Sequence, residues 1–249
     1  MNGKLGRLCF YKLGDQHVVR SIGRVGKERY ARAPAFERMR QNMREFGVAS
    51  MAAKDLRVAM APMLAGYTDP YVSARLTAAM LNVLKQDIGP AGQRTLNLPT
   101  NGASLEGFAF TRSAETPLTL FNIMCNEPRN TVYAHVSQFS PEKLLHIPAG
   151  STHFQLVVGV AALGTYAYDA ASGCYQRPGS PHRGLFGMKK TPIWPIDEDL
   201  PSTLLPVVLP NVVELPADEA LVVSSGVQFC GALSTGLSRS SMEIARFIP

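Results

Sequence analysis

The chain has 249 residues, 46% of them hydrophobic, which is enough for a sizeable core without support from disulfides or metals. Thirteen of its twenty-five Lys and Arg lie in residues 1–57 beside five of the nineteen Asp and Glu, a local balance of +8, whereas the remainder carries −2. The four cysteines are far apart and form no Cys-x-x-Cys pair, which argues against a disulfide framework and a zinc site. The asymmetry of charge points to a partner bound through the amino end.

The amino-terminal sequence lacks the pattern of a secretory signal. Arg7, Lys12 and Asp15 interrupt the apolar run of roughly 7 to 15 residues that such a signal needs. The longest apolar stretch, residues 154–168, contains Gln155 and two glycines and is shorter than the roughly 20 residues of a membrane-spanning helix. We therefore expect no Sec export and no membrane span, and a location in the cytoplasm or in an assembly built there.

Residues 1–33 are predicted to form a basic arm. In residues 7–22, apolar positions flank a turn at residues 13–16, where Gly14 permits the backbone of a tight β-hairpin. Because an isolated two-stranded hairpin is only marginally stable, it has to lie either on its own body or on another subunit. Residues 23–33 have no burying pattern and are predicted to be an extended basic link.

Residues 34–90 are predicted to be a two-helix hairpin. Pro34 is a favourable first residue for the first helix, and Glu37 and Glu45 are placed to pair with arginines on the same helix. Side chains recur at the spacing of one helical face: Phe36, Met39, Met43, Phe46, Ser50 or Met51, Ala53 and Leu56. A break at residues 61–66 separates this helix from a second one, which is capped near Asp69 and continues over residues 70–84.

From about residue 91 the sequence alternates between short apolar runs and Gly, Pro, Asn or Ser. This alternation predicts a mostly antiparallel β-sandwich over residues 91–249, and the whole chain is therefore expected to be an α+β protein. Strands are expected near residues 105–112, 118–125, 131–139, 153–160, 165–169, 207–215, 220–230 and 242–248. Residues 176–203, rich in Pro and Gly, are predicted to be a long loop.

The chain carries no clear signature of catalysis or of a bound group. His146 and His153 are close in sequence, but no Cys or carboxylate nearby completes a zinc site. The acidic run at residues 197–199 is typical of solvated surface. The basic loop at residues 177–190 lacks both a phosphate-binding glycine pattern and a following helix, so a contact with a neighbouring subunit is the preferred interpretation. We therefore expect no cofactor, no metal and no enzymatic activity.

The candidates for contact with a partner are aromatic and basic. Trp194, the single tryptophan, is either a core plug or an interface anchor. A basic stretch around Tyr30 suits phosphate contacts, which makes nucleic-acid binding the alternative to assembly. The candidates for assembly or partner binding are Phe10, Tyr11, Arg20, Arg24, Lys27, Arg29, Arg32, Arg40, Arg44 and Trp194.

The amino end contains a glycine-spaced hairpin with the pattern GxxGxxxFYxxG, a basic link and a helix with the pattern PAFxRxRxNxxEFG. The matching residues are Gly3, Gly6, Phe10, Tyr11, Gly14, Arg20, Pro34, Ala35, Phe36, Arg38, Arg40, Asn42, Glu45, Phe46 and Gly47. In these features the first quarter of the chain resembles a family of uncharacterised bacterial proteins. Residues 220–229 resemble that family's penultimate strand, whereas residues 231–241 depart from the longer hairpin expected there. The resemblance implies a shared arm and first helix and a variable β body, and it implies no activity.

The sequence therefore favours a non-enzymatic structural subunit that associates with itself, or with a larger protein machine, through its arm. Head-to-tail contacts produce rings if they close and filaments or tubes if they do not. A component of a phage-like or injection device is one protein of this kind. The alternative is a nucleic-acid-binding accessory protein that uses the basic arm and the Arg face of the first helix.

Overall fold

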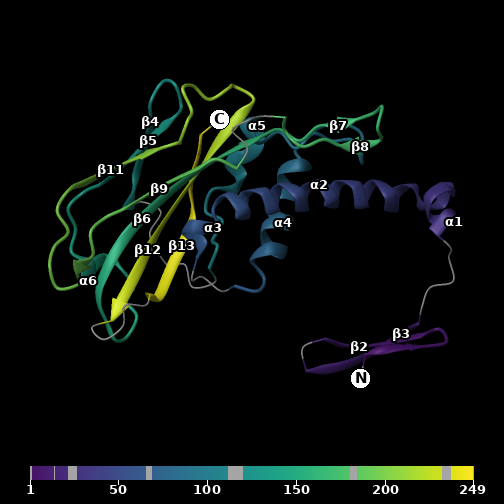
Figure 1. Ribbon diagram of the computed structural model, residues 1–249, viewed down its shortest axis with the longest axis horizontal. Helices are drawn as coiled ribbons and strands as arrows, with labels where there is room; N and C mark the ends of the chain where they lie inside the picture. Colours follow the sequence, from purple (N-terminus) through teal and green to yellow (C-terminus); the bar gives the residue numbers. More distant parts are fainter. Residues whose placement is uncertain are drawn as a thin grey trace. The chain divides into compact units, whose positions relative to one another are not determined.

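The computed structural model describes residues 2–13, 15–21, 27–65, 69–111, 120–179, 184–231 and 237–248. The chain divides into two compact units, unit 1 (Met1–Asn42) and unit 2 (Met43–Pro249), which are described one at a time. Both units contain helices and antiparallel strands (Figure 1). The predicted α+β class, with an amino-terminal hairpin, a long helix and antiparallel sheets, is confirmed.

Unit 1 begins with a three-stranded antiparallel sheet, which we call the arm sheet. Its strands, in spatial order, are β1 (Gly3–Leu5), β2 (Leu8–Leu13) and β3 (Gln16–Ser21). The predicted hairpin is confirmed in β2 and β3, where Phe10 lies opposite Val19. Gly6, at φ +56°, forms the two-residue turn that adds β1 to the hairpin. A strand of three residues is too short to show an alternating pattern in the sequence.

Residues 27–32 form the short helix α1 (Lys27–Arg32) and not the extended link that the sequence predicts. Arg40 stabilises this region from farther along the chain, because its Nη1 donates to the backbone oxygen atoms of Tyr30 at 2.7 Å and Ala33 at 3.0 Å. The ring of Tyr30 also packs against Phe36 in η1 (Pro34–Phe36), with ring centroids 4.6 Å apart. Arg40 and Phe36 lie outside residues 23–33, so the pattern of that segment alone does not predict the helix. Residues 23–26 of the predicted link lie outside the described residues.

The first predicted helix is confirmed as α2 (Glu37–Ala59), but a different face of it is buried. The predicted apolar face is open to solvent in its first half, where Met43 and Phe46 are 65% and 57% exposed. The buried apolar side chains are mostly small: Val48, Ala49, Ala52, Ala53, Leu56 and Ala59. Small side chains let the helix backbone approach its neighbours closely, and close packing favours this face over the bulkier one.

The remaining helices of this region are α3 (Ala61–Leu64) and α4 (Val72–Leu84). The second predicted helix is confirmed as α4, and its entry is fixed by Asp69, whose Oδ1 accepts the Tyr71 N–H at 2.8 Å. The expected break after the first helix is present, since α2 ends at Ala59, but residues 61–64 form the short helix α3, which the sequence did not predict, and Gly66 lies outside the described residues. Pro62 is compatible with α3 because the first turn of a helix does not need its N–H.

Two antiparallel sheets of unit 2 pack face to face as a sandwich. The larger sheet has the order β10-β6-β12-β13, with β9 also paired to β6, and the smaller has the order β11-β5-β4. The larger contains β6 (Ser151–Gly164), β9 (Phe186–Lys190), β10 (Trp194–Pro195), β12 (Glu219–Gly231) and β13 (Leu237–Ile248). The smaller contains β4 (Asn122–Cys125), β5 (Thr131–Val136) and β11 (Thr203–Val208). The other elements are β7 (Tyr168–Asp169), β8 (Cys174–Tyr175), α5 (Leu98–Asn101), η2 (Gly102–Leu105) and α6 (Pro141–Leu144).

The central strands β6 and β12 are buried on both faces and separate two hydrophobic cores. Leu156 and Val223 face the smaller sheet, whereas their neighbours Val157 and Val222 face the helices. Unit 2 therefore has three layers: the smaller sheet, the larger sheet, and a helical layer that contains α3, α4 and the second half of α2 (Figure 1).

Several strand predictions in the body are wrong. In the described part of residues 105–112 there is no strand; Leu105 ends η2, and the backbone of residues 107–108 bonds to Ile244 of β13. In place of the strand expected at residues 207–215, the structure has β11, which begins at Thr203 and ends at Val208. The predicted loop at residues 176–203 contains β9 and β10, which both pair with the long strand β6. These pairings join segments distant in sequence, so local patterns do not show them.

Candidate functional site

The arm sheet has no core of its own. None of the described residues in β1, β2 and β3 is buried, and Leu5 and Val19 are 73% and 53% exposed. A small sheet needs a covered hydrophobic face to be stable in water. The arm sheet is therefore a surface that gains stability when something covers it.

The two faces of the arm sheet differ in what already covers them. Directly opposite residues of an antiparallel ladder share a face, and successive pairs alternate between the two faces. Tyr11 therefore lies on the same face as Val18, and so does the pair of Cys9 and Arg20. On this face the guanidinium of Arg20 lies over the ring of Tyr11, 5.7 Å from its centroid. The other face, which we call the bare face, has these apolar members: Leu5, Leu8, Phe10 and Val19.

Of the four basic candidates of unit 1 whose side chains the structure describes, three are open to solvent. The exposed ones on β3 and α1 are Arg20, Arg29 and Arg32. Lys27 is the first residue of α1, and Arg24 lies outside the described residues. Arg40 differs because it is partly buried and holds the backbone of residues 30–33. Among these candidates, the charge shown to be exposed thus lies on β3 and α1.

Arg44 belongs to a polar cluster that joins α2 to the β7–β8 hairpin. Its Nη1 donates to the hydroxyl of Tyr168 at 3.1 Å, and its guanidinium lies 5.5 Å from the centroid of that ring. Tyr168 packs edge-on against Tyr175, with centroids 5.4 Å apart. Burial, and after it the nearby Glu45 carboxylate, raises the pKa of Tyr175 to about 12. The contacts of Arg44 therefore hold the hairpin on α2.

Glu45 does not pair on its own helix, contrary to the sequence prediction. Its carboxylate is buried and lies 3.1 Å from Nη1 of Arg94. The same carboxylate accepts the backbone N–H of Gly92 at 2.7 Å. Glu45 thus fastens the segment that follows α4 to α2, which is a contact between residues far apart in sequence.

Trp194 lies in β10 opposite Phe154 of β6. Its side chain is half-buried and packs against the core between the two sheets. The half-buried ring thus contributes to this core and also reaches the surface, so both roles that the sequence leaves open stay predictions.

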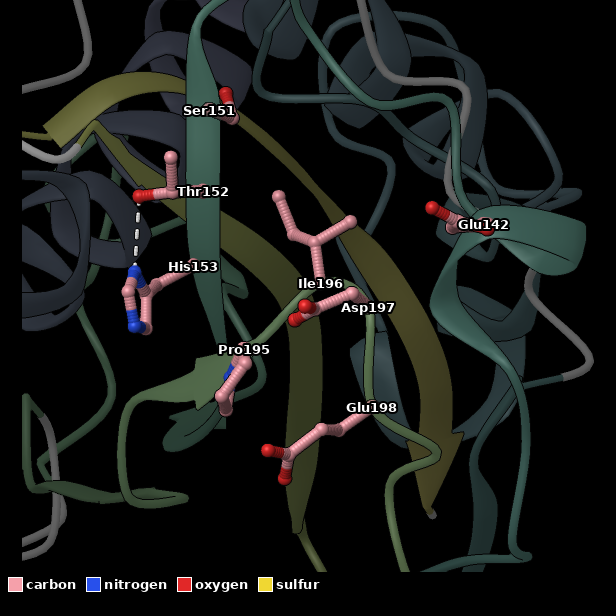
Figure 2. A pocket seen from close by; sticks show the side chains of 8 residues that line it. All are labelled: Glu142, Ser151, Thr152, His153, Pro195, Ile196, Asp197 and Glu198. Carbon is pink, nitrogen blue, oxygen red and sulfur yellow. Dashed lines mark hydrogen bonds between the residues drawn. The ribbon is translucent and has the colours of Figure 1, made fainter.

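A groove of about 530 Å³ opens where β6 begins and β10 ends (Figure 2). Three exposed carboxylates line it, and we call it the acidic groove: Glu142, Asp197 and Glu198. The buried Ile196 lies between the strand ends, and Thr152 Oγ1 lies 2.9 Å from Nδ1 of His153. Within the described part of the chain, none of the three carboxylates takes part in an ion pair. The acidic run at residues 197–199 was visible in the sequence, but only the fold brings Glu142 beside it.

The described residues contain no cluster of metal ligands, and their cysteines form no disulfide. Among them, no group of three or more His, Cys, Asp and Glu side chains is arranged to hold a metal ion. The four cysteines are free thiols: Cys9, Cys125, Cys174 and Cys230. In the same part of the chain, no helix combines the length and apolar character needed to cross a membrane.

No protein-family model, curated protein or solved structure that was compared with the chain matches it. The resemblance of residues 3–47 to a bacterial family therefore stays a prediction. Function has to be inferred from the surfaces of the molecule itself.

Proposed function

We propose that the protein is a non-enzymatic structural subunit that associates with copies of itself through the arm sheet. The assembly is a filament, a tube, a ring or a component of a phage-like or injection device. The observation that carries the proposal is that no described side chain of β1, β2 or β3 is buried. Burial against a neighbouring copy supplies the covered apolar face that such a sheet lacks by itself.

The distribution of charge supports contact between copies. Unit 1 has ten Lys and Arg and three Asp and Glu, a balance of +7, whereas unit 2 has a balance of −1. Unit 2 also contains the acidic groove. Contact between the arm of one copy and unit 2 of the next brings opposite charges together, which favours encounter and fixes orientation. A contact between two different surfaces is head-to-tail, and it leads to rings or filaments.

Nucleic-acid binding is the second candidate function. The observation that favours it is the exposure of Arg20, Arg29 and Arg32 on β3 and α1. A guanidinium presents several donors in a planar fork that matches phosphate oxygens. Binding of this kind depends little on sequence and falls steeply with salt.

Light scattering and electron microscopy of the purified full chain, in low and high salt and after nuclease treatment, test the proposal. Ordered particles that persist after nuclease treatment support a structural subunit. A monomer that comes away from nucleic acid only in high salt supports the second candidate. Absence of particles under every condition, at concentrations up to about 1 mM, overturns assembly as the function, since weaker self-association than about −4 kcal/mol does not build a stable structure.

A further inference from the structure

We infer that the bare face of the arm sheet is the face that packs on a second copy of this chain, and that the Tyr11 face stays in water. The bare face consists of Leu5, Leu8, Phe10 and Val19. This inference rests on the proposed function, because it names the surface through which the copies meet.

The two faces differ in the cost of removing them from water. On the Tyr11 face, Lys4 and Arg20 lie directly opposite Cys9 on either side, and Arg20 also lies over the ring of Tyr11. Long basic side chains cover apolar surface with their hydrocarbon stems while their charged ends stay in water. Burying this face would desolvate two cations, which is costly without carboxylate partners of good geometry.

Among the side chains that the structure describes, no cation lies over the apolar centre of the bare face. Leu8 is 42% exposed, and Leu5 and Val19 are more exposed still. The charged residue on this face, Lys12, lies at the turn end, 3.7 Å from Asp15. The apolar centre can therefore be buried while Lys12 remains at the rim, which is the usual arrangement of a protein interface.

Charge indicates which surface covers the bare face. Two arm sheets packed on one another would bring together two units that each carry +7, and like charges oppose such a contact. Unit 2 carries −1, and three of its exposed carboxylates line the acidic groove. Each copy thus holds an apolar, basic surface and a surface of opposite charge. The occupant is unit 2 of a second copy, in a head-to-tail contact.

Two double substitutions with identical chemistry separate the two faces. Leu8 and Val19 are diagonal neighbours on the bare face, and Leu13 and Val18 are diagonal neighbours on the Tyr11 face. The test variant carries both Leu8→Thr and Val19→Thr. The control variant carries both Leu13→Thr and Val18→Thr. Both pairs remove the same apolar groups and introduce the same two hydroxyls, and Thr keeps a high β propensity. A third protein combines all four substitutions.

The measurement is the protein concentration at half-maximal assembly, by light scattering of the full chain after nuclease treatment. We expect the bare-face pair to raise this concentration by about tenfold or more, since about 1.4 kcal/mol of lost burial is tenfold in affinity. We expect the Tyr11-face pair to raise it less than about threefold. Thermal unfolding of each variant checks that unit 2 is intact.

The other outcomes separate this inference from the proposed function. If the Tyr11-face pair impairs assembly as much as the bare-face pair, or more, the assignment of the face is wrong while assembly through the arm stands. If all three variants assemble like the unsubstituted protein, the arm sheet is not the contact and the proposed function fails with the inference. If the particles form only with nucleic acid present, the occupant is not a second copy.

Discussion

The carboxylate of Glu45 and the guanidinium of Arg94 form an ion pair, with Oε1 and Nη1 3.1 Å apart, between residues separated by 49 positions. Glu45 is 4% exposed and also accepts the N–H of Gly92, so its carboxylate satisfies two donors in a nearly dry site. The pair fixes the segment after α4 against the middle of α2. It is therefore a link between two parts of the helical layer.

Replacing Glu45 should destabilise unit 2 strongly. Glu45→Ala leaves the partly buried Arg94 without its partner and Gly92 without its acceptor, and we expect a loss of about 3 kcal/mol in the free energy of unfolding. Urea denaturation measures this loss. The control is Glu37→Ala, which removes the pair between an exposed carboxylate and the partly buried Arg40 and should cost less than about 1 kcal/mol. Similar losses for both variants would show that the buried pair contributes no more than a surface one.

Two glycines should respond to alanine with opposite signs. A Cβ at Gly187 in β9 would collide with the backbone oxygen of Val208 in β11, and backbone cannot move aside as a side chain can. Gly187→Ala is expected to cost about 2 kcal/mol or more, by overpacking. A Cβ at Gly47 in α2 meets nothing within 4 Å, so Gly47→Ala should stabilise by about 0.5 to 1 kcal/mol. Thermal unfolding of the two variants tests both signs, and a stabilised Gly187→Ala would contradict the close approach of β9 and β11.

The raised pKa of Tyr175 predicts a dependence of stability on alkaline pH. The phenol titrates near 10 in the unfolded chain and at about 12 in the folded protein, so the folded state binds this proton more tightly. The resulting stability is complete below about pH 10 and is lost as the pH rises from about 10 towards 12.

Tyr175→Phe should therefore lose stability less steeply than the unsubstituted protein across that range. Urea unfolding between about pH 9 and pH 11.5 measures the two slopes. Identical slopes for the two proteins would mean that burial does not hold the Tyr175 proton.

Charge reversal at the acidic groove should weaken association between copies. Asp197→Lys with Glu198→Lys places two cations where the basic arm is expected to dock, and we expect at least about fivefold weaker assembly in low salt and a smaller difference in high salt. Glu127→Lys with Glu214→Lys is the matched control, because these two carboxylates line a different hollow of about 440 Å³. An equal effect of both pairs would mean that net charge alone, and not the groove, governs the contact.

Substitution of the exposed arginines tests the nucleic-acid alternative. If that function is correct, Arg20→Gln, Arg29→Gln and Arg32→Gln together weaken binding to duplex DNA or RNA, and the slope of log affinity against log salt falls by about three. Fluorescence anisotropy over a series of salt concentrations measures this slope. The control replaces three exposed lysines of unit 2 with Gln: Lys54, Lys85 and Lys143. An unchanged slope in the arginine variant, or no binding by the original protein, removes the alternative.

Local sequence patterns determined the elements whose signals lie within a few residues. The hairpin of β2 and β3 follows from alternation around a turn, and α2 and α4 follow from a period of 3.6 residues with suitable first and last residues. Charge counting also located the basic arm, since net charge needs no structure. The sandwich followed from many short strands separated by turn residues.

Contacts between distant segments decided the rest. The buried face of α2 is the one whose small side chains fit the layer beneath, so Met43 and Phe46 stay in solvent although their spacing suggested burial. The helix α1 depends on Arg40, and β9 and β10 depend on pairing with β6. Glu142 joins Asp197 and Glu198 only because α6 and the end of β10 meet at one end of the larger sheet. The sequence by itself determined the local conformation of β2, β3, α2 and α4 and the sign of the arm's charge. Tertiary packing decided the other elements and which faces are buried, because burial depends on partners that local periodicity does not specify.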